Sequence, residues 1–152
     1  MIAIWRLCRA QWAKTAFSGA GAAANPGRWN SLGTRLVYCS ETRSLCALEI
    51  LAQVEDKRNL AQAKFVAIAV EVPEKLIARP ARFPPDWRAV PPPLSTRHWG
   101  DRFVVERRYP VVRVPSAVVL GEFNYLLSPL HPDFPVLQIG KPAPFSFDAR
   151  VA

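Results

Sequence analysis

The stretch Arg35–Val54, RLVYCSETRSLCALEILAQV, passes from a strand to a helix and decides the fold class. Its first part, Arg35–Cys39, is short and apolar, which is typical of a β-strand. Ser40 is a good N-cap and Glu41 suits a first helical turn, so the pattern predicts a helix over Glu41–Val54. A strand followed directly by a helix indicates a domain that mixes both kinds of element.

The segment before this stretch is predicted to carry a strand and two loops. Ile2–Leu7 alternates around a tryptophan and has a strand pattern. Ser18–Asn25 consists of small residues and is predicted to be a flexible loop, and Arg28–Gly33 forms a polar turn after Pro26-Gly27. Arg28 is therefore expected on a loop that faces a strand.

The segment after it mixes β-type, helical and proline-broken sequence in no regular order. A pattern of strand, surface connection, helix and β-type sequence is followed by two closing pieces broken by proline. This irregular order excludes a doubly wound sheet and favours a mixed α+β fold. The predicted strand is Lys64–Val72, the surface connection is Pro73–Pro93, and the helix is Ser95–Arg108, with Trp99, Phe103 and Val104 on one side. The β-type sequence is Pro110–Leu120, and the two closing pieces are Phe134–Ile139 and Phe145–Val151.

The length and composition predict a single folded domain over residues 1–152. Half of the residues are hydrophobic and 21% are charged, which is typical of a globule with its own core. No apolar run approaches the roughly 20 residues that span a bilayer, and Met1–Ala10 has no signal-peptide pattern. Cys8, Cys39 and Cys46 form an odd set without metal spacing, so we expect reduced thiols in the cytoplasm and no metal site.

The net charge of +8 and the pI near 10 point to an anionic partner. The 20 basic residues are spread along the chain, and no basic run is longer than the two residues of Arg107-Arg108. Direct nucleic-acid binding is therefore not expected, because no basic helix or zinc-finger spacing is present. An anionic small molecule or an acidic protein would account for the charge equally well.

Three residues stand out as candidates for chemistry. Glu49 is the only charge in the run Leu45–Ala52 and falls near the packed face of its helix, so it either reaches solvent or an arginine, or it has a function. Arg28 follows a glycine, and its guanidinium could bind a diphosphate through two parallel hydrogen bonds or stack on Trp29. Tyr38 could offer its ring to an aromatic base or be a core residue.

The two histidines do not suggest a site. His98 and His131 have no companion spacing for a metal. A triad of Ser116, His131 and Asp133 lacks a nucleophile-elbow sequence, so hydrolase chemistry of that type is not favoured. His131, in Leu-His-Pro-Asp, is predicted to belong to a turn.

A set of motifs along nearly the whole chain resembles the RES domain of bacterial toxin–antitoxin pairs. One departure is Ser128, where the family's Leu-Leu-Asn-Pro would have asparagine. The motifs are Trp5-Arg6-Leu7, Ser18–Ala22, Gly27-Arg28-Trp29-Asn30, Gly33, Val37-Tyr38, Ala47-Leu48-Glu49, Thr96–Asp101, Val114-Pro115-Ser116, Asn124–Leu127, Pro129, His131-Pro132-Asp133 and Phe145–Arg150.

This resemblance implies an ADP-ribosyltransferase-like fold, with a split, mostly antiparallel β-core flanked by helices around an NAD⁺ cleft. Arg28, Glu49 and Ser116 match the arginine, glutamate and serine of the family name. The resemblance further implies that Arg28 binds the NAD⁺ phosphates or ribose, that Tyr38 packs on the nicotinamide, and that Glu49 assists cleavage. Ser116 would line the NAD⁺ site, with further phosphate contacts from two more arginines, Arg6 and Arg43.

The function implied is that of a toxin that consumes NAD⁺ as its substrate and holds no bound cofactor. It would cleave the nicotinamide–ribose bond by hydrolysis or phosphorolysis, arrest growth, and be neutralised by an Xre-type helix-turn-helix antitoxin. One alternative is an ADP-ribosyltransferase that modifies a cellular protein. A second alternative is an inactive basic module that only binds a partner.

Overall fold

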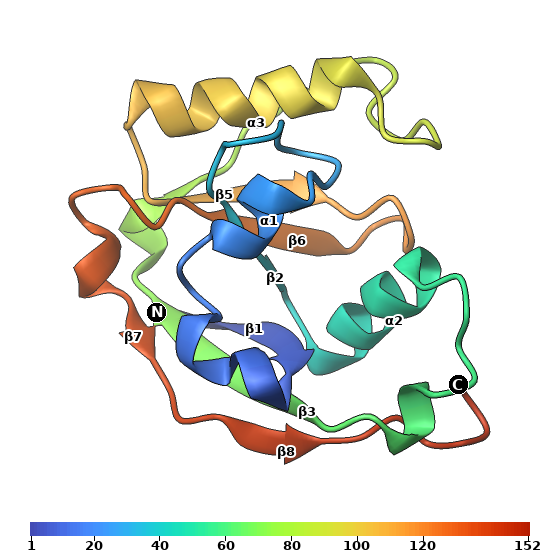
Figure 1. Cartoon of the computed structure of the whole chain (residues 1–152). Coiled ribbons are helices and arrows are strands. Elements are labelled where there is room, and N and C mark those ends of the chain that lie inside the picture. The colour runs from blue at the N-terminus through green and yellow to red at the C-terminus, as the bar shows by residue number, and fades with distance from the viewer.

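The computed structural model describes residues 1–152 as an eight-stranded sheet with three α-helices (Figure 1). The strand order is β4-β5-β6-β2-β1-β3-β7, and β8 also pairs with β3. All neighbouring strands are antiparallel except β4 and β5. None of the helices combines the length and the hydropathy that a membrane-spanning helix needs. The bounds are β1 Ile2–Arg9, α1 Ala20–Ala24, β2 Val37–Ser40, α2 Arg43–Gln53, β3 Phe65–Val72, β4 Ile77–Ala78, α3 Leu94–Glu106, β5 Val111–Pro115, β6 Phe123–Leu127, β7 Gln138–Ile139 and β8 Ala143–Phe145, with 3-10 helices at Ala10–Thr15, Leu60–Gln62, Glu74–Leu76 and Phe134–Val136.

The sheet is split between β1 and β2. β1 pairs with β3 along its whole length, and β2 pairs with β6 along its whole length. β1 and β2 are in register at one position, Trp5 opposite Ser40. Arg6 bridges the opening beside it, donating from Nη1 to the carbonyl of Tyr38 (3.3 Å) and from Nε to that of Ala16 (3.2 Å). The prediction of an α+β domain with a split, mostly antiparallel core is thus confirmed.

The two faces of the sheet are covered differently. One face carries a large apolar core that includes Ile4, Val37, Val70 and Leu127. Two helices pack on the other face, where α2 contacts β1 and β3 around Leu7 and α3 contacts β5 and β6. In Figure 1, α3 lies across the top of the molecule and α2 lies at the right, with β2 between them. The α3 contacts include Trp99, Phe103 and Val104, the apolar side predicted from sequence.

The helix predicted over Glu41–Val54 begins two residues later than its pattern suggests. α2 starts at Arg43, and the side chain of Thr42 caps it by accepting a hydrogen bond from the N–H of Leu45 (3.0 Å). Ser40, the predicted cap, is instead the last residue of β2. A serine and a threonine compete here as N-caps, and the strand pairing of Ser40 leaves the cap to Thr42.

The segment Ser18–Asn25, predicted as a flexible loop, contains the short helix α1. The prediction was wrong because a run of alanines favours a helix once neighbouring groups hold its ends. Gly19 provides the left-handed turn before the helix (φ +76°), and the carbonyl of Ala23 accepts a hydrogen bond from Gly33 (2.8 Å).

The strand β6 was missed by the sequence pattern. The β-type sequence predicted over Pro110–Leu120 ends as β5 at Pro115, and β6 follows after a turn. Because β6 is short and buried on both faces toward its end, it shows no alternation of polar and apolar residues. The closing segments contain the short strands β7 and β8.

The helix α3 makes one unusually close backbone contact. Gly100 faces the carbonyl of Trp29, and a Cβ at this position would stand 1.6 Å from that oxygen. Only glycine therefore allows α3 to approach the loop before β2.

We expect Gly100→Ala to lower the free energy of unfolding by about 3 kcal/mol or more, because the added methyl group forces α3 away from this loop. Urea unfolding measures the change. Gly21→Ala is the matched control, since a Cβ there meets nothing within 4 Å and alanine is favoured in α1. Equal midpoints for the two variants would contradict the close packing.

Candidate active site

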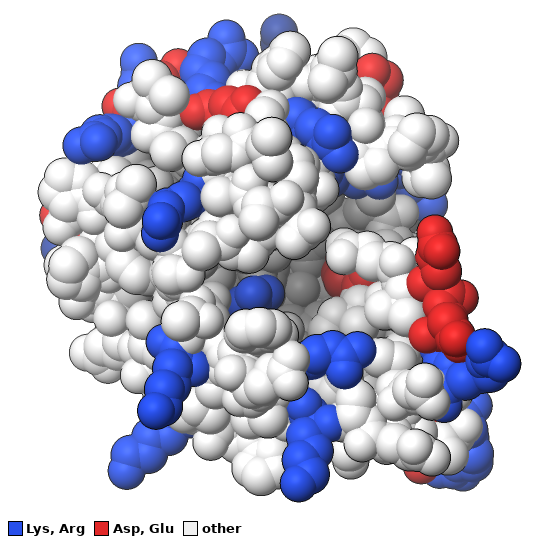
Figure 2. All heavy atoms as spheres, viewed as in Figure 1, with Lys and Arg blue, Asp and Glu red and all other residues white.

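The candidate site lies on the helix-covered face of β2 and β6, between α2 and α3. Tyr38 comes from β2, Asn124 from β6, Glu49 from α2 and Arg28 from the loop between α1 and β2. The continuous segment from Arg28 to Glu49 thus meets the distant strand β6 at the split edge of the sheet. Figure 2 shows this side of the molecule hollowed near its middle, with a basic side chain inside the hollow and acidic atoms at its edge.

The loop that carries Arg28 is built around the side chain of Asn30. Asn30 is fully buried, and its Oδ1 accepts hydrogen bonds from the N–H of Gly27 (2.9 Å) and the hydroxyl of Tyr38 (2.6 Å). Its Nδ2 donates to three main-chain carbonyls, of Ala22, Ser31 and Thr34. Every polar atom of this amide is satisfied, so the loop has one defined conformation.

The helix α3 fixes the same loop from its other side. Arg97 donates from Nε to the carbonyl of Gly27 (3.1 Å), and Asp101 accepts from the N–H of Ser31 (2.9 Å). Between these two contacts lies the close approach of Gly100 to Trp29. Arg28 is therefore presented from a rigid backbone.

The guanidinium of Arg28 is held by the proline-rich connection before α3. Its Nη1 donates to the carbonyls of Trp87 (2.8 Å) and Ala89 (2.7 Å). Burial lowers the pKa of Arg28, and the nearby Glu49 and Tyr38 partly offset this effect.

Arg28 has no part in the aromatic stacking that the sequence left open. Trp29 is buried and packs edge-on against Trp99 (ring centroids 5.2 Å apart) and Phe83 (5.7 Å). The tryptophan anchors the loop under α3, while Arg28 turns toward the main chain of residues 87–89.

Tyr38 connects the loop of Arg28 to the sheet. Its hydroxyl accepts a hydrogen bond from the N–H of Trp29 (3.0 Å) while it donates to Asn30, and Gly27 packs on its phenol. Burial raises the pKa of Tyr38, so the phenol stays protonated at neutral pH. The tyrosine holds the site in shape, and its hydroxyl is not available as an acid or base.

The carboxylate of Glu49 is half-buried and is held by neutral groups. Its Oε2 accepts hydrogen bonds from the hydroxyl of Ser116 (2.9 Å) and from Nδ2 of Asn124. None of the four ion pairs of the protein involves Glu49, so the predicted alternative of an arginine partner is wrong. The two neutral donors therefore orient the carboxylate group and leave its negative charge unpaired.

Three residues predicted to contact NAD⁺ have other roles in the fold. Ser116 is 1% exposed and lies behind Glu49, where its hydroxyl also accepts from the N–H groups of residues 118 and 119, so it cannot line the surface of the site. Arg6 bridges the split in the sheet. Arg43 is exposed and stacks on the ring of Trp5, with 4.9 Å between its Cζ and the ring centroid.

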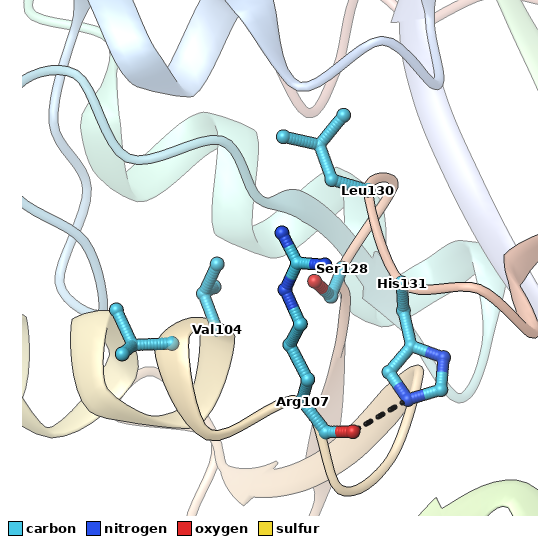
Figure 3. A pocket seen from close by; sticks show the side chains of 6 residues that line it. Val104, Arg107, Ser128, Leu130 and His131 are labelled. Carbon is cyan, nitrogen blue, oxygen red and sulfur yellow. Dashed lines mark hydrogen bonds between the residues drawn. The ribbon is translucent and has the colours of Figure 1, made fainter.

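The alternative triad of Ser116, His131 and Asp133 is not assembled. His131 accepts a hydrogen bond at Nδ1 from the N–H of Asp133 (2.9 Å), and its Nε2 bonds the carbonyl of Arg107 (3.0 Å; Figure 3). It closes a turn, as predicted, and lines a pocket of about 220 Å³ that includes none of the site residues.

Sequence reasoning missed Asn30, Ser40 and Asn124 as members of the site. Each is an uncharged polar residue, and such residues are common in turns and at the ends of strands and helices. The burial of Asn30 and Ser40 and the side-chain hydrogen bonds of all three residues distinguish them, and both are properties of the fold.

A family model described as RES domain matches residues 3–148 of the chain. A protein named Toxin Res from Yersinia enterocolitica serotype O:8 / biotype 1B is 30% identical over 97% of this chain and 98% of its own length. Toxin Res from Photorhabdus laumondii subsp. laumondii is 34% identical over 97% of this chain and 96% of its own length. A Prs ADP-ribosylating toxin from Sphingobium sp. is 30% identical over 88% and 85% of the two chains.

Among solved structures, the chain resembles one from the toxin–antitoxin complex MbcT-MbcA of M. tuberculosis. The TM-score is 0.66, and the match covers 95% of this chain and 84% of the other. The sequences are 16% identical, so this likeness supports the shared fold.

We expect Tyr38→Phe to destabilise the protein by about 1–3 kcal/mol, because it leaves the N–H of Trp29 buried without a partner. Thermal unfolding checks this, and Tyr109→Phe is the control, since Tyr109 is 40% exposed and makes no hydrogen bond through its hydroxyl within the protein. An unchanged midpoint for Tyr38→Phe would mean that the hydroxyl does not support the loop.

Proposed function

The chain belongs to the RES domain family, and from this premise we propose that it is the toxin of a toxin–antitoxin pair that consumes NAD⁺. The reaction is cleavage of the nicotinamide–ribose bond, by hydrolysis or phosphorolysis, and loss of NAD⁺ arrests growth. One observation carries this proposal: Glu49 is an ionisable carboxylate oriented by neutral donors, with Arg28 and Tyr38 close by.

The chemistry of the bond suits a single carboxylate. Cleavage develops positive charge on the ribose, and an unpaired carboxylate stabilises that charge. Both described hydrogen bonds to Glu49 end on Oε2, so Oε1 is left to face the ribose. Nicotinamide leaves as a neutral molecule, so the reaction needs no strong general acid.

Arg28 is arranged to bind the diphosphate of NAD⁺. The two carbonyls of residues 87 and 89 occupy Nη1, whereas Nε and Nη2 donate no hydrogen bond within the protein. A guanidinium edge with two free donors matches two phosphate oxygens. Tyr38 supplies a ring for the nicotinamide from β2, and the exposed Arg43 is a candidate for a weaker phosphate contact from α2. Arg6 is a weaker candidate because its Nε and Nη1 already bind main-chain carbonyls.

An ADP-ribosyltransferase acting on a protein is the second candidate. The relative from Sphingobium sp. is named a Prs ADP-ribosylating toxin, and such a transfer differs from NAD⁺ consumption only in the acceptor. Water, phosphate and a protein side chain can each capture the same ribosyl cation.

The products formed from NAD⁺ separate these functions. The purified protein is incubated with NAD⁺ alone, with NAD⁺ and phosphate, and with NAD⁺ and bacterial lysate. Free ADP-ribose indicates hydrolysis, a phosphorylated ADP-ribose indicates phosphorolysis, and labelled protein indicates transfer. Absence of nicotinamide release in all three reactions would leave only the inactive binding module and would overturn the enzyme assignment.

We expect Glu49→Gln to lower the rate of nicotinamide release by about 100-fold or more, because it removes the charge that stabilises the ribosyl cation. The melting temperature should stay similar or rise, since a glutamine oxygen still accepts from Ser116 and Asn124. Glu55→Gln, an exposed change of equal charge, is the control. Full activity of Glu49→Gln would defeat the catalytic role of Glu49.

The partner proposed for the chain is an Xre-type helix-turn-helix antitoxin in the cytoplasm. The resemblance to a chain from a toxin–antitoxin complex supports an antitoxin as the partner. The net charge of +8 favours fast association with an acidic segment.

We expect the antitoxin to place an acidic segment over the cleft near Arg28, and so to block NAD⁺ by direct occlusion. Titrating the antitoxin should abolish nicotinamide release, and the association rate should fall as salt is added. Glu49→Gln should bind the antitoxin as well as the native protein does. A complex structure with the cleft left open would show that neutralisation works in another way.

A further inference from the structure

We propose that Ser40 and Asn124 act as a positioning pair that sets the orientation of the Glu49 carboxylate for bond cleavage. This inference rests on the proposed function, and it assigns the task to two residues that do not themselves contact the substrate. The pair links the sheet to α2 at the point where the active-site hollow opens.

Ser40 and Asn124 stand directly opposite each other in the register of β2 and β6. The hydroxyl of Ser40 donates to Oδ1 of Asn124 (2.7 Å), and Nδ2 of Asn124 donates to Oε2 of Glu49. Ser40 is 4% exposed, so water does not compete for its hydroxyl. The three side chains form one chain of donors that runs from the sheet to the carboxylate.

This chain of donors has only one workable direction. If the amide of Asn124 were turned over, its Oδ1 would face the carboxylate oxygen, and two acceptors would be in contact. The carboxylate excludes that arrangement because it only accepts, and the hydroxyl of Ser40 then donates to the Oδ1 that faces it. Ser40 therefore holds the amide in this orientation, and the amide holds Glu49.

The pair also preserves the charge that catalysis needs. Asn124 and Ser116 are both neutral, so they hold the carboxylate without cancelling its negative charge. A lysine or arginine in the same place would form an ion pair and weaken the attraction for the ribosyl cation. Ser116 approaches Oε2 from the end of β5 and Asn124 from β6, which together define the plane of the carboxylate.

The test measures kcat and KM for nicotinamide release. Asn124→Asp keeps the shape and the bond from Ser40 but replaces the donor to Glu49 with an acceptor, so kcat should fall about 100-fold with KM changed less than about 2-fold. Ser40→Ala should lower kcat by roughly 10-fold and should cause no further loss in an Asn124→Ala background, because Ser40 acts through Asn124. Asn59→Asp and Ser44→Ala, both exposed, are the matched controls.

A second measurement does not depend on activity. In the ¹H–¹⁵N spectrum of the native protein, one hydrogen of the Asn124 amide should be shifted downfield by its bond to the charged carboxylate, and Glu49→Gln and Ser40→Ala should both reduce this shift. Native kcat in Asn124→Asp, or additive losses from Ser40→Ala and Asn124→Ala, would overturn the inference. A native protein that shows the downfield amide but releases no nicotinamide would overturn the proposed function and leave the orientation of Glu49 standing.

Discussion

The buried side-chain amide of Asn30 joins α1, the loop of Arg28 and β2, the parts of the fold from which the candidate site is built. It is fully buried, so each of its polar atoms needs a partner, and it finds them in α1, in its own loop and in β2. An unpaired buried amide costs several kcal/mol, and this cost excludes other arrangements of the loop. The position of Arg28 and the position of the Tyr38 ring thus follow from one residue between them.

The cleft forms where the sheet is split. Two groups of strands meet at the single pair of Trp5 and Ser40, and α2 and α3 each cover one group on the same side. The space between the helices is where Glu49 meets Asn124. Because the carboxylate is held by neutral donors and the guanidinium by carbonyl groups, both charges are fixed in place without pairing with each other.

Much of the fold could be predicted from the sequence where a pattern is local. The strands β1 and β3 and the helices α2 and α3 follow the period of their apolar residues, and their ends are off by one or a few residues. β6 could not be found in this way, because it is buried on both faces near its end and has no period. The alanines of α1 have the composition of a loop, and the groups that hold the helix lie outside it, at residues 30 and 33.

The family motifs and the single charge in the apolar run of α2 are visible in the amino-acid sequence, and they suffice to select Arg28, Tyr38 and Glu49 as candidate site residues. Only the tertiary structure decided that Ser116 lies behind Glu49, that Arg6 bridges the sheet, and that Ser40 and Asn124 belong to the site. The physical reason is that a charge in an apolar stretch is unusual in any context. The role of an uncharged polar side chain, by contrast, depends on the partner that the fold brings within hydrogen-bonding distance.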